Sequence, residues 1–424
     1  MDTRRLGAGE AWDAVLYGAS CLAALAVLST SQGPLDLQWA RVAAPGYGIG
    51  ALAAWVMSRR AAGIRARAIL AVAVFAAVAV VPTLAQAGAR SETATADVKS
   101  DVLVVEQAAA TLLEGRNPYA LVHDDGPLAR WPAWAQNHFP YLAATIAAGV
   151  PRALAGPEPW TDARLLSLAL ALAVAVPSIL WSGASAEWRL RAFLVLFVLV
   201  TGAPLVVTSG KEVVILGLLI ASLVALRRGH PSVSGFTVGS AAAMHQLAWV
   251  VLPFFAFLPP RSGGRRVIAI GAGIAIAAVV PFLAWDADAF VEDAVLFPLG
   301  FGQPADASPF TPGGLLATVL PDSRWPMIVA IVLAAGACAA AAIRRGARTP
   351  ADVARWAGTL LLVVVILAPR ARLAYFALPA NLLVWSRMLR EDRAIDAPRP
   401  GGTRSEGQIR PSTSTSRSTS SLSL

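Results

Sequence analysis

Charged side chains are scarce in this chain, where Asp, Glu, Lys and Arg make up 14% of the 424 residues. Soluble globular proteins carry about a quarter of their residues in these four types, so a single soluble domain is excluded. A hydrophobic content of 56% also excludes an intrinsically disordered chain, which would be poor in apolar residues. The composition therefore predicts an all-α polytopic membrane protein, and its length allows about ten to twelve transmembrane helices.

Cysteine and lysine are also rare. The two cysteines, Cys21 and Cys338, both lie in apolar runs, which excludes a disulfide-stapled secreted domain. Lys99 and Lys211 are the only lysines, so arginine supplies nearly all of the positive charge behind the net +9. Basic residues gather beside membrane spans on the cytoplasmic side. This bias explains the net charge, and we expect no nucleic-acid partner.

Apolar runs predict the crossings, and the basic clusters between them set the orientation. With these clusters placed inside, both termini are predicted to be cytoplasmic in a plasma-membrane protein. Residues 1–390 form one transmembrane domain, and the Ser/Thr-rich segment 391–424 is predicted to be a disordered cytoplasmic tail. The predicted crossings are 12–30, 41–57, 67–86, 163–182, 190–208, 212–226, 267–284, 326–343, 355–369 and 372–389.

Two further apolar stretches cannot be ordinary crossings. Residues 140–155 form a short stretch interrupted by proline and glycine, which favours a re-entrant or interfacial hairpin. Residues 233–258 have arginines at both ends, so both ends belong on the cytoplasmic side. The stretch is too short to cross a bilayer of about 30 Å twice as full helices. We therefore predict two short helices that meet near His245 and Gln246.

This topology leaves two long extracytoplasmic loops, 87–162 and 285–325. In the first, apolar residues at near-helical spacing over 102–113 predict an amphipathic helix at the membrane surface. Asp97 and Asp101 stand near its start. One interpretation is that Ser100 or Asp101 caps the helix; the other is a general base at the lipid–water boundary, where partial desolvation raises a carboxyl pKa.

The remaining polar residues of the loops allow two interpretations. The aromatic residues around His138 are typical of an interfacial belt, and a lone histidine there is either a hydrogen-bonding surface group or a ligand or proton shuttle. Neither His123 nor His138 has the spacing of a metal site, and we expect no metal and no cofactor. The acidic second loop is either a cover for an acceptor or an amphipathic interfacial segment.

A set of short motifs resembles the GT-C-fold glycosyltransferases, and most closely the polyprenol-phosphate-mannose-dependent enzymes of glycosyltransferase family 87, typified by mycobacterial α-1,2-mannosyltransferases. The resemblance covers roughly residues 67–390. It departs from the family in two extra spans before the first large loop, and in His245 where the family often has a lysine. The residues that carry it are Asp101, Glu106-Gln107-Ala108-Ala109, Leu112-Leu113, Gly115, Asn117-Pro118-Tyr119, His138-Phe139-Pro140-Tyr141, Met244-His245-Gln246 and the region Arg370–Pro379.

The resemblance implies roles for individual residues. An aspartate of the first large outside loop serves the family as general base, which makes Asp101 the expected catalytic residue and Asp97 its competitor. Arg370 and Arg372 lie at the predicted outer end of a span; they either snorkel in a tight turn or bind the donor phosphate. Lys211 and His245 are further expected phosphate contacts, although Lys211 could instead form only an ion pair with Glu212. The residues expected in the substrate loop are Glu106, Asn117, Tyr119, His138 and Tyr141.

The sequence therefore predicts a membrane glycosyltransferase with a GT-C-like bundle. It would transfer mannose or another sugar from a polyprenyl-phosphate donor to a glycolipid or glycan acceptor of the cell envelope, with the bilayer as a further partner. The alternative is a multi-pass transporter or flippase for a lipid-linked substrate. Such a transporter typically shows internal repeats and charged residues within its spans, and this sequence shows neither. A structural or assembly protein would not require Asp101 and Arg370 to converge.

Overall fold

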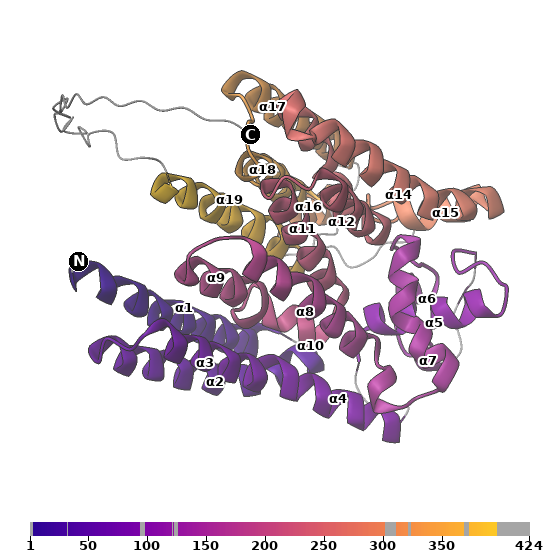
Figure 1. The fold of residues 1–424 in the computed structure, drawn as a ribbon. Helices are drawn as coiled ribbons and strands as arrows, with labels where there is room; N and C mark the ends of the chain where they lie inside the picture. The colour runs from indigo at the N-terminus through magenta and orange to yellow at the C-terminus, as the bar shows by residue number, and fades with distance from the viewer. Residues whose placement is uncertain are drawn as a thin grey trace, which may run out of the picture.

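The computed structural model describes residues 3–31, 33–93, 98–120, 122, 126–301, 311–320, 324–368 and 373–396. Within these residues every regular element is a helix (Figure 1). Seven of the described helices are long and apolar enough to cross a membrane, by length and composition: 11–30, 64–92, 163–181, 186–208, 264–285, 325–345 and 350–367. These observations confirm an all-α polytopic membrane protein.

The N-terminal helices form one side of the bundle (Figure 1). They are α1 (Thr3–Thr30), α2 (Pro34–Arg59), α3 (Ile64–Phe75), the π-helical turn η1 (Ala76–Val80) and α4 (Val81–Glu92). A π turn disturbs the regular backbone hydrogen bonding, and α2 supplies a replacement donor because Trp39 Nε1 donates to the Val78 carbonyl. Likewise, the Tyr47 hydroxyl donates to the Val198 carbonyl in η5 (Leu194–Val198), the second π turn.

The centre of the bundle is α11 (Lys211–Arg227), in which nearly every residue is buried. A helix that is hydrophobic all round is one that other helices surround. The segments before it are α8 (Ala163–Trp181), α9 (Ala186–Phe193) and α10 (Ala203–Thr208), with η5 between α9 and α10. The crossing predicted at 190–208 is thus a broken helix, and the chain enters α11 through Gly210, whose φ of +81° suits glycine.

The stretch 233–258 is broken where the sequence predicts. Helix α12 (Pro231–Met244) ends at His245, whose backbone is extended, and α13 (Gln246–Trp249) follows at once. Two 3₁₀ segments, η6 (Leu252–Phe257) and η7 (Pro260–Ser262), lead into α14 (Gly264–Trp285). The last helices are α17 (Arg324–Arg345), α18 (Pro350–Leu367), η10 (Leu373–Phe376) and α19 (Ala377–Asp396).

The first of the two loops predicted to be extracytoplasmic, 87–162, folds into a small helical layer at one end of the bundle (Figure 1). It contains α5 (Ser100–Leu113), η2 (Gly126–Leu128), α6 (Ala133–Gln136), η3 (Ala143–Gly149), α7 (Val150–Ala155) and η4 (Pro159–Thr161). Ten of the 14 residues of α5 are buried, so the helix does not lie with one apolar face on a membrane. The apolar run 102–105 covers its whole circumference, and other loop segments bury it.

One glycine explains how closely these loop segments approach. A Cβ on Gly149 would lie 2.5 Å from the Val105 carbonyl oxygen and 2.7 Å from the Glu106 Cα. Only glycine therefore lets η3 reach the backbone of α5. The second loop adds α15 (Ala287–Val291), η8 (Glu292–Leu296) and α16 (Pro312–Val319).

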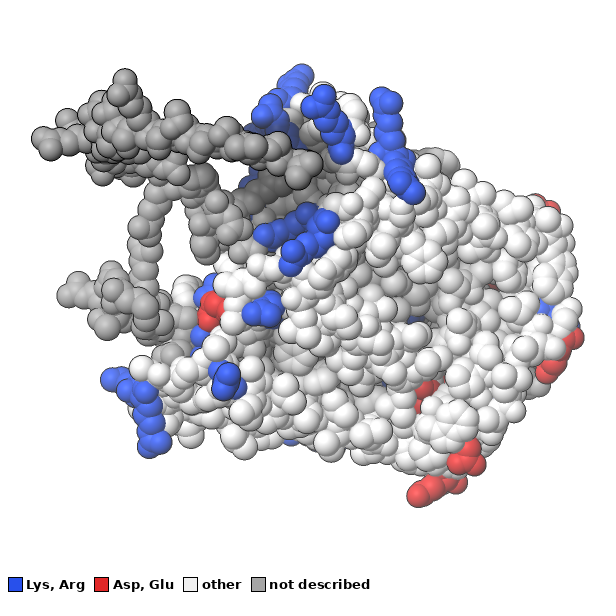
Figure 2. Space-filling view, in the orientation of Figure 1, with Lys and Arg blue, Asp and Glu red and all other residues white. Residues whose placement is uncertain are grey.

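Charge is separated between the two ends of the molecule. Figure 2 shows Lys and Arg side chains mainly toward the end where α1 begins, Asp and Glu mainly at the end that carries the two long loops, and a largely uncharged surface between them. Exposed arginines at the turns between helices include Arg59, Arg60, Arg228, Arg261, Arg265, Arg344, Arg345 and Arg348; exposed acidic residues of the opposite end include Glu92, Glu114, Glu158, Asp288 and Glu292.

Candidate active site

A cavity of about 830 Å³ opens where the first loop, the break after α12 and the second loop meet. Its polar wall includes Asp101, His138, Tyr141, His245 and Tyr375. An apolar part of its lining comes from α17, from α18 and from the residue that follows α18: Met327, Ile328, Ile331, Val364, Val365 and Ala368. A volume of this size holds a drug-sized ligand, and the contrast between the walls suits a ligand with one polar and one apolar end.

Asp101 lies in the first turn of α5 and is 8% exposed. The Tyr141 hydroxyl donates a 2.6 Å hydrogen bond to its Oδ1, and Lys211 Nζ stands 3.8 Å from its Oδ2. Lys99 is the N-cap residue of α5, and no side chain caps the helix. The capping interpretation therefore does not describe this helix, and the Asp101 carboxylate borders the cavity.

Lys211 lies behind Asp101 rather than on the cavity wall. It is 3% exposed at the start of α11, 3.0 Å from Glu212 Oε1, and its ammonium group lies 4.3 Å from the centre of the Tyr141 ring. Ser209 Oγ accepts a hydrogen bond from Lys211 Nζ at 3.1 Å. The ion pair with Glu212 thus forms, and the same ammonium compensates the charge of a buried Asp101.

His245 occupies the chain break between α12 and α13. The Leu247 N–H donates to His245 Nδ1 at 3.2 Å, so in the neutral ring the proton is on Nε2, which is then a donor. The ring lies between those of Tyr141 and Tyr375, with centroid distances of 6.1 and 6.0 Å. The helix break therefore places an oriented imidazole on the wall that also carries Asp101.

His138 of the first loop contacts Asp293 of the second loop. Its Nδ1 lies 2.6 Å from Asp293 Oδ1, and the Phe139 N–H donates to Asp293 Oδ2 at 2.7 Å. Burial raises the pKa of the Asp293 carboxyl, and these two hydrogen bonds oppose the rise. The second loop therefore packs against the first at the edge of the cavity, and Gln246 Nε2 supports the same packing by donating to the carbonyls of Pro140 and Ala294.

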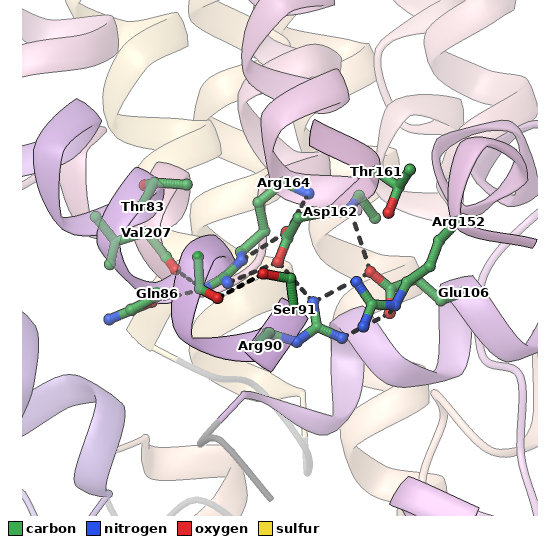
Figure 3. A network of polar contacts seen from close by, with 12 residues as sticks. Thr83, Gln86, Arg90, Ser91, Glu106, Arg152, Thr161, Asp162, Arg164 and Val207 are labelled. Carbon is green, nitrogen blue, oxygen red and sulfur yellow. Dashed lines mark hydrogen bonds and ion pairs between the residues drawn. The ribbon is translucent and has the colours of Figure 1, made fainter. Parts of the chain in front are cut away.

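Glu106 points into a different cluster of buried charges, shown in Figure 3. Its carboxylate pairs with Arg90 of α4 at 2.7 Å and lies 3.4 Å from Arg152 of α7. Asp162 continues the cluster, because it pairs with Arg90 at 2.6 Å and with Arg164 at 2.8 Å. Glu106 is absent from the described wall of the cavity, and this cluster ties α5 to α4 and to the start of α8.

Asn117 and Tyr119 shape the turn after α5. Asn117 Oδ1 accepts a hydrogen bond from the Tyr119 N–H, and the Tyr119 hydroxyl donates to the Tyr141 carbonyl. The Tyr119 ring packs edge-on against Phe139, Phe282 and Phe290. Both residues therefore support the segment that carries His138 and Tyr141. Three other predicted site residues, Asp97, Arg370 and Arg372, lie outside the described residues.

The sequence did not single out several residues of the site: Tyr375 was visible only within the region Arg370–Pro379, and Asp293 only within the acidic second loop. Only the fold brings Tyr375 and Asp293 to the region of the cavity. Asp162 belongs to the buried cluster because it stands at the start of α8. Glu212 was visible only as a neighbour of Lys211. Among the described residues no group of three or more His, Cys, Asp or Glu side chains could hold a metal ion.

The comparisons with known proteins give one match. The model of glycosyltransferase family 87 matches residues 138–369, which is more than half of the chain. The matched range contains His138, Tyr141, Lys211 and His245; it begins after Asp101 and ends before Arg370. No curated protein and no solved structure matches the chain.

Proposed function

Because this chain belongs to glycosyltransferase family 87, we propose that it transfers a sugar from a polyprenyl-phosphate donor to a glycolipid or glycan acceptor of the cell envelope. Mannose fits the resemblance best, and another hexose or a pentose is the alternative. The reaction would take place at the outer face of the plasma membrane, with Asp101 as the general base.

The observation that carries this proposal is the position of Asp101. It is a buried carboxylate on the polar wall of a large cavity, held by Tyr141 and Lys211. The apolar wall from α17 and α18 suits the hydrocarbon part of a lipid-linked donor, whose sugar and phosphate would then face the polar wall. A general base must lie within hydrogen-bond reach of the proton that it removes, and a substrate in this cavity meets that requirement.

The proposed step is a single displacement. An acceptor hydroxyl attacks the anomeric carbon of the donor sugar, its proton passes to Asp101, and the bond from the anomeric carbon to the phosphate oxygen breaks. The polyprenyl phosphate leaves with the bonding electron pair. Positive groups that face the phosphate stabilise the charge that develops on it.

We assign the phosphate to the side of the cavity that carries His245, whose Nε2–H can donate a hydrogen bond to a phosphate oxygen. Arg370 and Arg372, the donor-phosphate contacts expected from the sequence, would add charge-assisted hydrogen bonds. Lys211 is better suited to keep Asp101 ionised than to bind phosphate, because its ammonium group already faces Asp101 and Glu212.

The charge separation in Figure 2 supports the orientation that we propose. If the arginine-rich turns lie at the cytoplasmic side, both termini are inside and the cavity opens toward the outer side. This is the face at which a lipid-linked sugar would present its head group to Asp101.

The test is transfer of labelled mannose from polyprenyl-phosphate mannose to an alkyl mannoside, with the full-length protein in proteoliposomes. We expect Asp101→Asn to lower kcat by at least about 10²-fold, the scale of general-base catalysis. The matched control is Asp288→Asn, which makes the same change at an exposed residue of the second loop and should retain wild-type transfer. Wild-type transfer by Asp101→Asn would refute the assignment.

A further inference from the structure

His138, which borders the cavity, forms with Asp293 a second buried polar pair, separate from the contacts of Asp101. His138 is 6% exposed and Asp293 is 3% exposed, and the imidazole and carboxylate meet at 2.6 Å. The Phe297 ring covers one face of the imidazole, with centroids 4.2 Å apart and an angle of 32° between the planes. The imidazole is therefore fixed at one edge and on one face.

The partners of Asp293 determine which nitrogen of His138 carries the proton. Asp293 Oδ2 accepts the Phe139 N–H, so an ionised Asp293 uses Oδ1 to accept the proton on His138 Nδ1. In a neutral ring the other nitrogen, Nε2, then presents a lone pair. This nitrogen is buried and has no hydrogen-bond partner among the described residues, an arrangement that is unfavourable unless a partner is supplied.

The location of the ring identifies that partner. His138 and Phe297 both border the cavity that contains Asp101. His138 and Tyr141 are three residues apart, so their Cα atoms lie at most about 11 Å from each other, and the Tyr141 hydroxyl binds Asp101. His138 therefore borders the same cavity in which a sugar would react at Asp101.

We propose that His138 Nε2 accepts a hydrogen bond from one hydroxyl group of a sugar bound in the cavity, with Asp293 as the residue that positions the imidazole, and that this contact selects the sugar. The inference rests on the proposed function, because it assumes a sugar substrate. The hydroxyl group can belong to the donor sugar or to the acceptor, and the experiment distinguishes the two sources.

The experiment uses two series of substrates with the full-length protein in proteoliposomes. One series is polyprenyl-phosphate mannose and its monodeoxy analogues; the other is octyl α-mannoside and its monodeoxy analogues. For the wild type we expect one analogue to lose kcat/KM by about 10–100-fold relative to its parent, the effect of leaving one buried acceptor unpaired. The series that contains this analogue identifies the source of the hydroxyl group.

Two variants test the role of the dyad. His138→Phe keeps a ring of similar shape but removes Nε2, so the parent substrate should fall to the level of the deoxy analogue and the discrimination should approach 1. Asp293→Asn should donate an amide N–H to Nδ1, which moves the ring proton to Nε2 and removes the acceptor. Glu292→Gln is the matched control, because it changes the exposed neighbouring carboxylate and should keep the wild-type discrimination.

Each outcome decides a separate point. If His138→Phe keeps wild-type discrimination against every analogue in both series, the inference is overturned, whereas a merely structural role would lower all rates equally and leave the ratios unchanged. If the wild type transfers nothing from these donors, the proposed function fails. In that case ¹⁵N NMR of the four histidines, assigned with His138→Phe, still decides the inference: a proton on Nε2 at neutral pH refutes it, and an unprotonated Nε2 that gains a proton in Asp293→Asn supports it.

Discussion

The Tyr141 hydroxyl donates a 2.6 Å hydrogen bond to Asp101 Oδ1, across 40 residues of sequence. The same ring lies under the Lys211 ammonium group. Tyr141 therefore holds both the proposed base and the cation that compensates its charge. This arrangement depends on a loop segment, 138–142, that docks against the break after α12, where the Met244 carbonyl accepts the Leu142 N–H and the Thr145 hydroxyl.

Removing the hydroxyl group of Tyr141 should slow the reaction without preventing binding. A hydrogen bond to a charged group is worth about 1.5–3 kcal/mol, so Tyr141→Phe should lower kcat by roughly 10–100-fold while KM changes little. Steady-state transfer kinetics measure both constants. Tyr17→Phe, at a buried tyrosine of α1, is the matched control; a change confined to KM in Tyr141→Phe would contradict an orienting role.

The buried charges around Lys211 predict that one pair of substitutions can restore the stability of the protein without restoring its activity. Lys211→Met leaves the Asp101 and Glu212 carboxylates without their shared cation, and loss of one partner of a buried pair costs about 3–5 kcal/mol. The thermal midpoint in detergent should fall. The double variant Lys211→Met with Glu212→Gln removes one of the two carboxylates and should recover much of the midpoint, yet remain inactive. Recovery of transfer in this double variant would show that Lys211 has no part in the reaction.

The cluster in Figure 3 predicts a dependence of stability on pH. Burial alone would raise the pKa of Asp162, but hydrogen bonds from Arg164 and the charges of Arg164 and Arg90 hold this pKa well below its ordinary value. Because the folded pKa is lower than the unfolded value of about 3.9, the carboxylate stabilises the fold fully above that pH. The stabilisation is lost as the pH falls through the folded pKa.

Asp162→Asn removes this contribution and leaves two arginines without a shared partner. We expect a loss of about 3–5 kcal/mol at neutral pH, read as a lower thermal midpoint of the purified protein. Below pH 4 the midpoint of the wild type should fall toward that of the variant. Parallel curves over the whole range would show that Asp162 is not ionised in the folded protein at neutral pH.

The apolar wall of the cavity predicts a donor-specific effect. Ile331 of α17 borders the cavity, whereas its neighbour Val332 is exposed and does not border it. Ile331→Trp should narrow the apolar side and raise the KM for the polyprenyl-phosphate donor several-fold, with little change in the KM for a water-soluble acceptor. Val332→Trp adds the same bulk outside and should behave as the wild type; an equal effect of both variants would place the lipid elsewhere.

Local patterns predicted the fold well where one helix or one break explains them. The conflict between arginines at both ends of residues 233–258 predicted two short helices, and the break lies at His245 as expected. The spacing of apolar residues predicted the helix over 102–113, but not that the loop would bury it on almost every side. Burial depends on η3 and α7, whose approach requires Gly149 and cannot be inferred from α5 itself.

The sequence likewise predicted some contacts of the candidate site and not others. Asp101 and Lys211 were both expected to be functional, and the structure brings them to 3.8 Å. Glu106, five residues after Asp101, was expected to serve the substrate as well. It faces Arg90 and Arg152 instead, because five residues rotate a helix by well over one turn and the two carboxylates leave α5 in different directions.

By itself, the sequence determined that this protein is a helical membrane protein with many apolar segments, and that many of its acidic residues lie in two loops. These properties follow from composition and periodicity, which act over one turn or one span. Only the tertiary structure decided that Tyr141 binds Asp101, that Asp293 of the second loop orients His138 of the first, and that Glu106 belongs to a separate ion cluster. Such pairs join positions 16 to 155 residues apart, and hydrogen bonds and charges in a buried site depend on direction and distance that no local pattern records.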